Sequence, residues 1–370
     1  MQTPENPFAG RIHRAVSQLQ QRDLAGIALV PGPNLRYLTG LNLHSSERLT
    51  LALFAPGAKP AFVLPAFETD RAEQALSMEA DLFGYSDEEG PKPALAQACR
   101  RLGLPGRRVA GESLHMRLME MWRLREADVE VAAGDEILTS LRMRKDAQEL
   151  AAMREAAIRT DRVLHEFLPA MKPGRTEKEL AAKLRSSLLE ASGEGVSFSP
   201  ILVAGPNGAL PHGGPSERPL QMGDLITIDC GIFYDGYVSD ITRTFSLGDV
   251  ETELHVVYET VLAANRAGRE ACRPGASAES VDRAARAVIR DAGYGEFFTH
   301  RTGHGIGLEV HEPPYIVEGN GTTLEPGMTF TVEPGIYLPG RGGVRIEDDV
   351  AITPDGVEAL TSFPRDLIVL

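Results

Sequence analysis

Two aspartates inside an apolar stretch are the first residues of this sequence whose type and position suggest chemistry. The segment LITIDCGIFYDGYVSDITRTF reads as two strands joined by a turn, and it carries Asp229 and Asp240. Aspartate is unfavourable in strands. A turn between Tyr234 and Asp235 would place the two carboxylates directly opposite each other, and a turn about Asp235-Gly236 would place them diagonally on one face. A solvated face would tolerate this pair, whereas burial would require a cation.

An internal repeat supplies two further acidic residues in equivalent places. The segment GDLITIDCGIF matches GMTFTVEPGIY, so that Glu333 occupies the position of Asp229. Before each copy lies a Pro-Gly step and an amphipathic helix that ends at a glycine. A second acid follows each copy, Asp240 in the first and Glu347 in the second. The repeat predicts two αβ halves about a pseudo-twofold axis, whose four carboxylates converge and need about two divalent cations.

Histidine would complete such a site, and the segment HRTGHGIGLEVHE contains three histidines, of which His304 lies between two glycines. Glycines leave room for an ion to approach. A lone histidine in such a loop is often structural or exposed, but beside four paired acids metal ligation becomes the better interpretation. This oxygen-rich donor set favours manganese or cobalt, with zinc or iron as alternatives, over a thiolate zinc site. His311 and His212 could line the same cleft without binding metal.

Length, charge and cysteine usage restrict the class of protein. A chain of 370 residues suggests about two domains. The formal net charge of −14 argues against nucleic acid or an anionic membrane as a partner. Three scattered cysteines make neither a disulfide framework nor a zinc knuckle, which favours a reducing compartment. No signal-peptide core and no run of roughly 18 apolar residues is present, so we expect a cytoplasmic protein.

The remaining segments indicate how these residues are positioned. The first third alternates short apolar runs with helical patterns, which predicts a small α/β domain. Asp146 and Glu149 form a capping box that opens a long helix. The domain boundary is expected near residue 140. Strands are expected at GIALV (26–30), LTLALF (49–54) and AFVLP (61–65), and helices over 67–80 and 93–102.

The acidic and histidine motifs together resemble those of the "pita-bread" metallopeptidases. The contexts TIDCG, SDITRTF, GHGIGLEVHE, TVEPGIY and VRIEDD carry this resemblance, which covers essentially the whole chain. Within that group the chain is similar to the Xaa-Pro peptidases, prolidase and aminopeptidase P. The resemblance implies an α/β (α+β) fold with a small creatinase-like N-terminal domain, residues 1–140, and a pseudo-twofold pita-bread catalytic domain, residues 141–370. Methionine aminopeptidases typically lack the first domain, and creatinase lacks a dinuclear metal site.

The same resemblance implies two divalent metal ions per chain, with Mn²⁺ expected and Co²⁺ or Zn²⁺ as alternatives. Asp240 and Glu347 would bridge the two ions. Asp229 would complete the coordination of one ion, and His304 with Glu333 would complete that of the other.

Catalytic and substrate-binding roles also follow from the resemblance. Glu333 would shuttle the proton, and His311 with His212 would stabilise the tetrahedral intermediate and hold the substrate. Three further residues would surround the metals and contact substrate: His300, Tyr337 and Arg345. For Arg345 a plain ion pair with Glu347 is an equal alternative.

The expected activity is hydrolysis of the Xaa-Pro bond in dipeptides, as in prolidase. The alternatives are an aminopeptidase P that acts on longer peptides, and a metal-free creatinase-like hydrolase or binding protein. The expected partners are a small peptide with proline second and a second copy of the chain in a homodimer.

Selection of dipeptides requires a cation for the carboxylate of the C-terminal proline. Prolidases often place an arginine shortly after the second histidine, but Tyr315 stands there in this sequence. Arg48, in the segment LTGLNLHSSERLT, is the substitute that we expect to bind this carboxylate, from its own chain or a partner's. An exposed arginine paired with Glu47 is the alternative.

Overall fold

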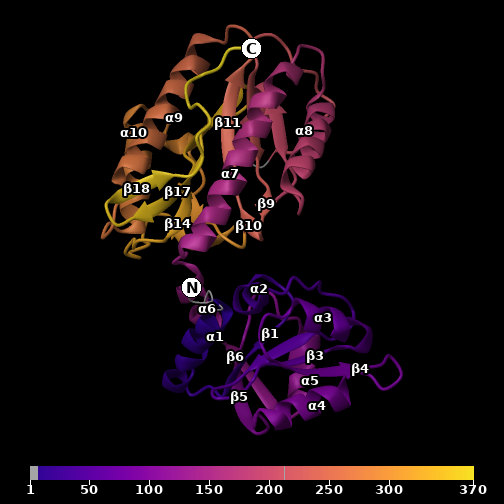
Figure 1. Ribbon diagram of the computed structural model, residues 1–370. Helices are drawn as coiled ribbons and strands as arrows, with labels where there is room; N and C mark the ends of the chain where they lie inside the picture. The colour runs from indigo at the N-terminus through magenta and orange to yellow at the C-terminus, as the bar shows by residue number, and fades with distance from the viewer. Residues whose placement is uncertain (1–6, 212) are drawn as a thin grey trace, which may run out of the picture. The chain divides into compact units, whose positions relative to one another are not determined.

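The chain forms two compact units in the computed structural model, Met1–Arg142 and Met143–Leu370 (Figure 1). The structure describes residues 7–211 and 213–370, so His212 lies outside the described residues. Within these ranges no helix has both the length and the apolar character needed to cross a membrane. We refer to the two parts as the N-terminal unit and the C-terminal unit.

The N-terminal unit is built on one mixed sheet of six strands in the order β4-β3-β2-β1-β5-β6. The predicted strands are present as β1 (Gly26–Leu29), β2 (Leu51–Phe54) and β3 (Ala61–Pro65), which pair antiparallel and are fully buried. The outer strands, which the apolar pattern did not reveal, pair in parallel: β4 (Asp81–Tyr85), β5 (Arg107–Gly111) and β6 (Val129–Ala133).

Helices flank the strands of this sheet. The helix predicted over 67–80 is shorter, because the chain first makes a 3₁₀ turn at Ala66–Glu68 and becomes extended at Leu76. The helix predicted over 93–102 is α4. The helices of this unit are α1 (Pro7–Ser17), α2 (Pro33–Thr39), α3 (Thr69–Ala75), α4 (Lys92–Arg101), α5 (Leu118–Glu126) and α6 (Asp135–Arg142).

The C-terminal unit shows the repeat as two copies of two helices followed by a three-strand core. The core strands are hydrogen-bonded in the orders β7-β8-β11 and β12-β14-β17, and β13 and β18 extend the second sheet. The first copy consists of α7 (Ala147–Phe167), α8 (Glu177–Ser192), β7 (Ile201–Ala204), β8 (Leu225–Cys230) and β11 (Ile241–Ser246). The second consists of α9 (Thr252–Ala271), α10 (Ala278–Asp291), β12 (Gly303–Gly305), β13 (Glu312–Ile316), β14 (Thr329–Val332), β17 (Asp348–Thr353) and β18 (Gly356–Ala359).

The helices of the C-terminal unit lie on two flanks of its strands, α7 with α8 on one and α9 with α10 on the other (Figure 1). The predicted capping box is present, since the Asp146 side chain accepts hydrogen bonds from the backbone N–H groups of Gln148 and Glu149. Apolar side chains of α7 and α8 pack on β7, β8 and β11, and those of α10 pack on β14 and β17. Each half therefore has its own core.

A buried arginine ties the two halves together. Arg243 of β11 is 1% exposed, and its guanidinium donates to the Glu347 carbonyl oxygen of the second half. The same guanidinium pairs with Asp348, at 2.8 Å between Nη2 and Oδ1. A charge this deeply buried is tolerated because the carboxylate and several carbonyl groups satisfy it.

The hairpin that contains Asp229 and Asp240 turns at Asp235-Gly236. Tyr234 pairs with Tyr237 in the short strands β9 (Phe233–Tyr234) and β10 (Tyr237–Val238), and both turn residues have positive φ, 49° and 81°. The same register pairs Asp229 with Thr242. Asp240 is thus the diagonal neighbour of Asp229, as predicted for this turn.

Candidate metal centre

Three of the predicted residues present ligand atoms within 4.8 Å of one another: Asp240, His304 and Glu347. All three are buried. Asp240 lies directly before β11 and Glu347 directly before β17, which are equivalent strands of the two halves, and His304 lies in β12. The repeat therefore brings one acid from each half to the same place.

His304 is held in the state that a metal ligand requires. Its Nδ1 donates to the Gly305 carbonyl oxygen at 3.2 Å. Its Nε2 lies 3.4 Å from Glu333 Oε1 and 3.9 Å from Asp240 Oδ2. Burial, and next the neighbouring His311, lower the pKa of His304 to about 3. The imidazole is therefore neutral and presents the Nε2 lone pair to the carboxylates.

The carboxylates carry the electrostatic signature of a cation site. Burial first, and neighbouring carboxylates second, raise the pKa of Asp240 and of Glu347 well above the usual range. Burial also raises the pKa of Glu333 to about 7. Among the described residues, Oδ1 of Asp229 and Oδ1 of Asp240 are buried without a hydrogen-bond partner. Such oxygens are costly unless something binds them, so this donor set fits divalent cations.

Arg345 orients Asp229, the acid that β8 contributes to the site. Its Nη2 lies 2.5 Å from Asp229 Oδ2, its Nε donates to Thr242, and its Nη1 donates to the Tyr337 hydroxyl at 3.0 Å. The Tyr337 hydroxyl in turn lies 2.8 Å from Nε2 of His300. The ion pair with Glu347 that was considered from sequence is not the one that forms, because Arg345 pairs with Asp229 instead.

Two threonine hydroxyls hold the second-half acids, and sequence reasoning missed this function. Thr242 Oγ1 donates to Glu347 Oε2 at 2.5 Å, and Thr331 Oγ1 donates to Glu333 Oε1 at 3.2 Å. Each threonine lies on a strand beside the acids, where β-branched residues are common for reasons of propensity alone. Their sequence therefore carries no signal that separates this role from an ordinary strand position.

A cavity of about 620 Å³ brings eight of the predicted residues together. Tyr337 is not among its lining residues, but the Tyr337 hydroxyl contacts Arg345 and His300, which are. Sequence reasoning missed the apolar part of the wall and Arg301, which follows His300 directly. The lining residues are Phe198, Ile201, Pro211, Asp229, Asp240, His300, Arg301, His304, Val310, His311, Glu333, Arg345 and Glu347.

Arg48 belongs to a different cavity, of about 220 Å³, in the N-terminal unit. Its guanidinium forms a two-pronged pair with Asp87, at 2.9 Å for both contacts, and a 2.6 Å contact with Glu47. It also lies over the Phe67 ring, with 5.6 Å between Cζ and the ring centre. The pairing with Glu47, the alternative considered from sequence, is therefore present, and Asp87 strengthens it.

Comparison with known proteins agrees with this geometry. Residues 151–354 match the model of metallopeptidase family M24, and residues 11–144 match the creatinase/prolidase N-terminal domain. The chain is 35% identical to an Xaa-Pro dipeptidase of Lactobacillus helveticus, over 93% of this chain and 95% of the other.

Two solved structures share both units. The dipeptidase PepE of Mycobacterium ulcerans is 38% identical, with a TM-score of 0.90 and 98% of each chain covered. A prolidase from Thermococcus sibiricus is 35% identical, with a TM-score of 0.93, 99% of this chain and 100% of the other covered. The expected fold, a creatinase-like domain followed by a pita-bread domain, is confirmed. The chain belongs to metallopeptidase family M24.

Proposed function

We propose that this protein hydrolyses the Xaa-Pro bond of dipeptides with two divalent cations, manganese being the first choice. The observation that carries the proposal is one cavity lined by four carboxylates and a neutral imidazole, with two carboxylate oxygens left without hydrogen-bond partners. A dipeptidase and a prolidase of the same architecture support the substrate class. An oxygen-rich set with one imidazole suits manganese or cobalt better than thiolate-type zinc.

The chain's residues divide between two cation positions. Asp229 would hold one cation, His304 and Glu333 would hold the other, and Asp240 and Glu347 would contact both. When bound, divalent cations supply an acidified water molecule and a Lewis acid for the scissile carbonyl.

The surrounding residues would bind the substrate and move the proton. Glu333 would accept a proton from the attacking water and pass it to the leaving nitrogen. His311, whose ring lies 4.2 Å from that of His304 between centres, would donate to the oxyanion that develops on the carbonyl. An apolar part of the wall would hold the proline ring: Phe198, Ile201, Pro211 and Val310.

The activity is tested with manganese-loaded protein on Ala-Pro, Ala-Pro-Ala and Ala-Ala, each with and without a chelator. We expect rapid, chelator-sensitive release of proline from Ala-Pro and slow cleavage of the other two peptides. Faster cleavage of Ala-Pro-Ala would favour an aminopeptidase, and activity that survives complete removal of metal would refute the proposal.

The ligand assignment predicts loss of metal from three variants. Asp240→Ala, Glu347→Ala and His304→Ala should each bind less manganese and lose activity, because each residue contacts at least one cation. Elemental analysis after dialysis measures the metal content per chain. Asp355→Ala, which removes an exposed carboxylate from the turn between β17 and β18, is the matched control. Full metal content with near-normal turnover in any of the three variants would contradict the assignment.

A different outcome is expected for the second histidine. His311→Ala should keep its metal and lose about 10²- to 10³-fold in kcat, the usual effect of removing an oxyanion donor. Steady-state kinetics and elemental analysis of the same preparation separate the two effects. Loss of metal from this variant would show that His311 is a ligand.

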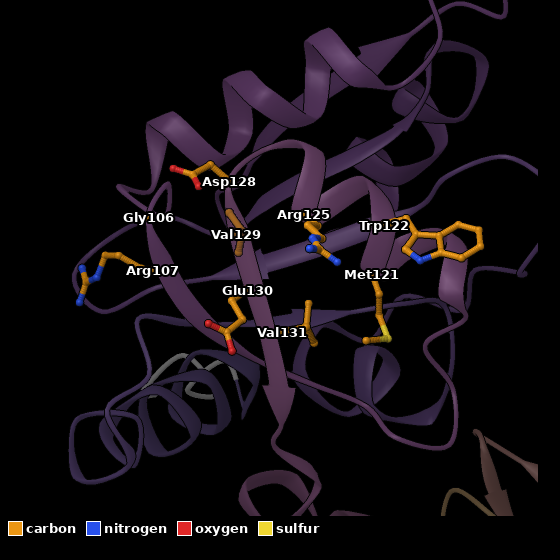
Figure 2. A pocket seen from close by; sticks show the side chains of 9 residues that line it. All are labelled: Gly106, Arg107, Met121, Trp122, Arg125, Asp128, Val129, Glu130 and Val131. Atoms are coloured by element: carbon orange, nitrogen blue, oxygen red, sulfur yellow. The ribbon is translucent and has the colours of Figure 1, made fainter.

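We also propose a homodimer that forms through the edge of the N-terminal sheet. Strand β6 is an edge strand, and beside it α5 exposes Leu118, Met121 and Trp122, of which the first and last are 62% exposed. Figure 2 shows Met121 and Trp122 beside β6 in a cavity of about 590 Å³. Two arginines and two acids also line this cavity, so a twofold partner can pair opposite charges: Arg107, Arg125, Asp128 and Glu130.

The sole tryptophan of the chain makes this surface easy to test. The wild-type protein should sediment at about twice the chain mass of 40.0 kDa, and dilution should shift its tryptophan emission to the red. Trp122→Glu should sediment as a monomer, because a charge on the apolar surface opposes association. The control is Leu210→Glu, which alters an exposed apolar residue of the C-terminal unit. A dimeric Trp122→Glu variant would exclude this surface.

A further inference from the structure

Arg301 is the arginine of the metal-centre cavity that has no acidic partner within the described chain. The other arginine of the wall, Arg345, is paired with Asp229. The Arg301 guanidinium instead lies over the Tyr315 ring, with 4.5 Å between Cζ and the ring centre. Over residues 7–211 and 213–370 its side chain forms no ion pair and no hydrogen bond. A half-buried guanidinium on a cavity wall with its donors unused is suited to an anionic ligand group.

The backbone on both sides of Arg301 is fixed by α10. The N–H and hydroxyl groups of Thr302 donate to Asp282 Oδ1 at 3.2 and 2.7 Å. On the other side, Arg286 Nη2 donates to the His300 carbonyl oxygen at 2.9 Å. Asp282 and Arg286 pair with each other, at 2.9 Å between Oδ1 and Nη2. The position of Arg301 is therefore set before any ligand binds, which lowers the entropic cost of binding.

Tyr315 provides the platform from the neighbouring strand. Gly303 of β12 pairs with Ile316 of β13, and this register brings Tyr315 beside Arg301. Stacking restricts the guanidinium plane without using its N–H donors. Tyr315 occupies the sequence position at which prolidases often carry an arginine. The cation is present at that place, but Arg301, two residues before β12, supplies it.

We propose that Arg301 binds the C-terminal carboxylate of the dipeptide substrate. This inference rests on the proposed function. A dipeptide that ends in proline carries a free carboxylate on its leaving residue, whereas a longer peptide has a neutral amide there. The guanidinium fork matches a carboxylate through two parallel hydrogen bonds and makes no such pair with an amide. Arg301 would thereby favour dipeptides over longer substrates.

The test compares Ala-Pro with its C-terminal amide, which differs only in the charge at the proposed contact. Arg301→Met should lower kcat/KM for Ala-Pro about 10- to 100-fold, chiefly through KM, since a hydrogen bond to a charged group is lost. The effect on the amide should be much smaller. For Ala-Pro, the kcat/KM of Arg301→Lys should lie between those of the wild-type protein and Arg301→Met, because lysine keeps the charge and loses the two-pronged geometry. Arg290→Met, which removes an exposed arginine on α10, should leave both substrates unchanged.

The remaining outcomes count either against the role of Arg301 or against the proposed peptidase function. An equal loss on both substrates would give Arg301 a structural role only, and a carboxylate-specific loss in Arg48→Met instead would assign the contact to Arg48. If the wild-type protein cleaves neither substrate, the proposed function fails. Calorimetry with L-proline and L-prolinamide then still tests Arg301: the wild-type protein should bind proline more tightly, and Arg301→Met should lose that preference. Retention of the preference would overturn the inference.

Discussion

Repulsion among four carboxylates that line one cavity is the constraint on which this site depends. Asp229, Asp240, Glu333 and Glu347 share one cavity, and burial with mutual repulsion raises the pKa of the last three. Like charges at this distance in a low dielectric oppose folding unless protons or cations accompany them. The threonine hydroxyls and the Arg345 guanidinium hold carboxylate oxygens of this group in place, and the Nε2 lone pair of His304 faces the same space, an arrangement that suits a bound cation.

The duplicated architecture places these acids without any long loop. Each half carries its acids next to equivalent strands, β8 and β11 in the first, β14 and β17 in the second. Both halves have their own helix pair and a core cluster of their own, which support the strand ends that carry the acids. The buried contact between Arg243 and Asp348 then fixes how the two sets of acids face each other.

Local signals were readable from sequence, and contacts between distant segments were not. The Asp235-Gly236 turn determined the hairpin register, and the Asp146 capping box determined where α7 begins. The repeat indicated which acids are equivalent, because both copies keep the same pattern of glycine, threonine and acid. Strands β5 and β6 were missed since Arg107, Arg108 and Glu130 interrupt their apolar pattern.

Side-chain partners were harder to predict than elements. The stacking of Arg301 on Tyr315 depends on the pairing of β12 with β13, and no short-range pattern reports that register. Arg48 pairs with an aspartate 39 residues away, which local sequence does not indicate. The apolar wall of the cavity is likewise assembled from residues as far apart as Phe198 and Val310.

The division of the ligands between two halves has a thermodynamic consequence. A cation held by Asp240 from one half and Glu347 from the other would act as a reversible crosslink between the two halves. Its binding free energy would then be shared with the docking of those halves, as for any ligand that binds only the assembled state. Metal supply would then set the cooperativity of the C-terminal unit: we expect metal-saturated protein to unfold in a single transition and metal-depleted protein to open first between its two halves.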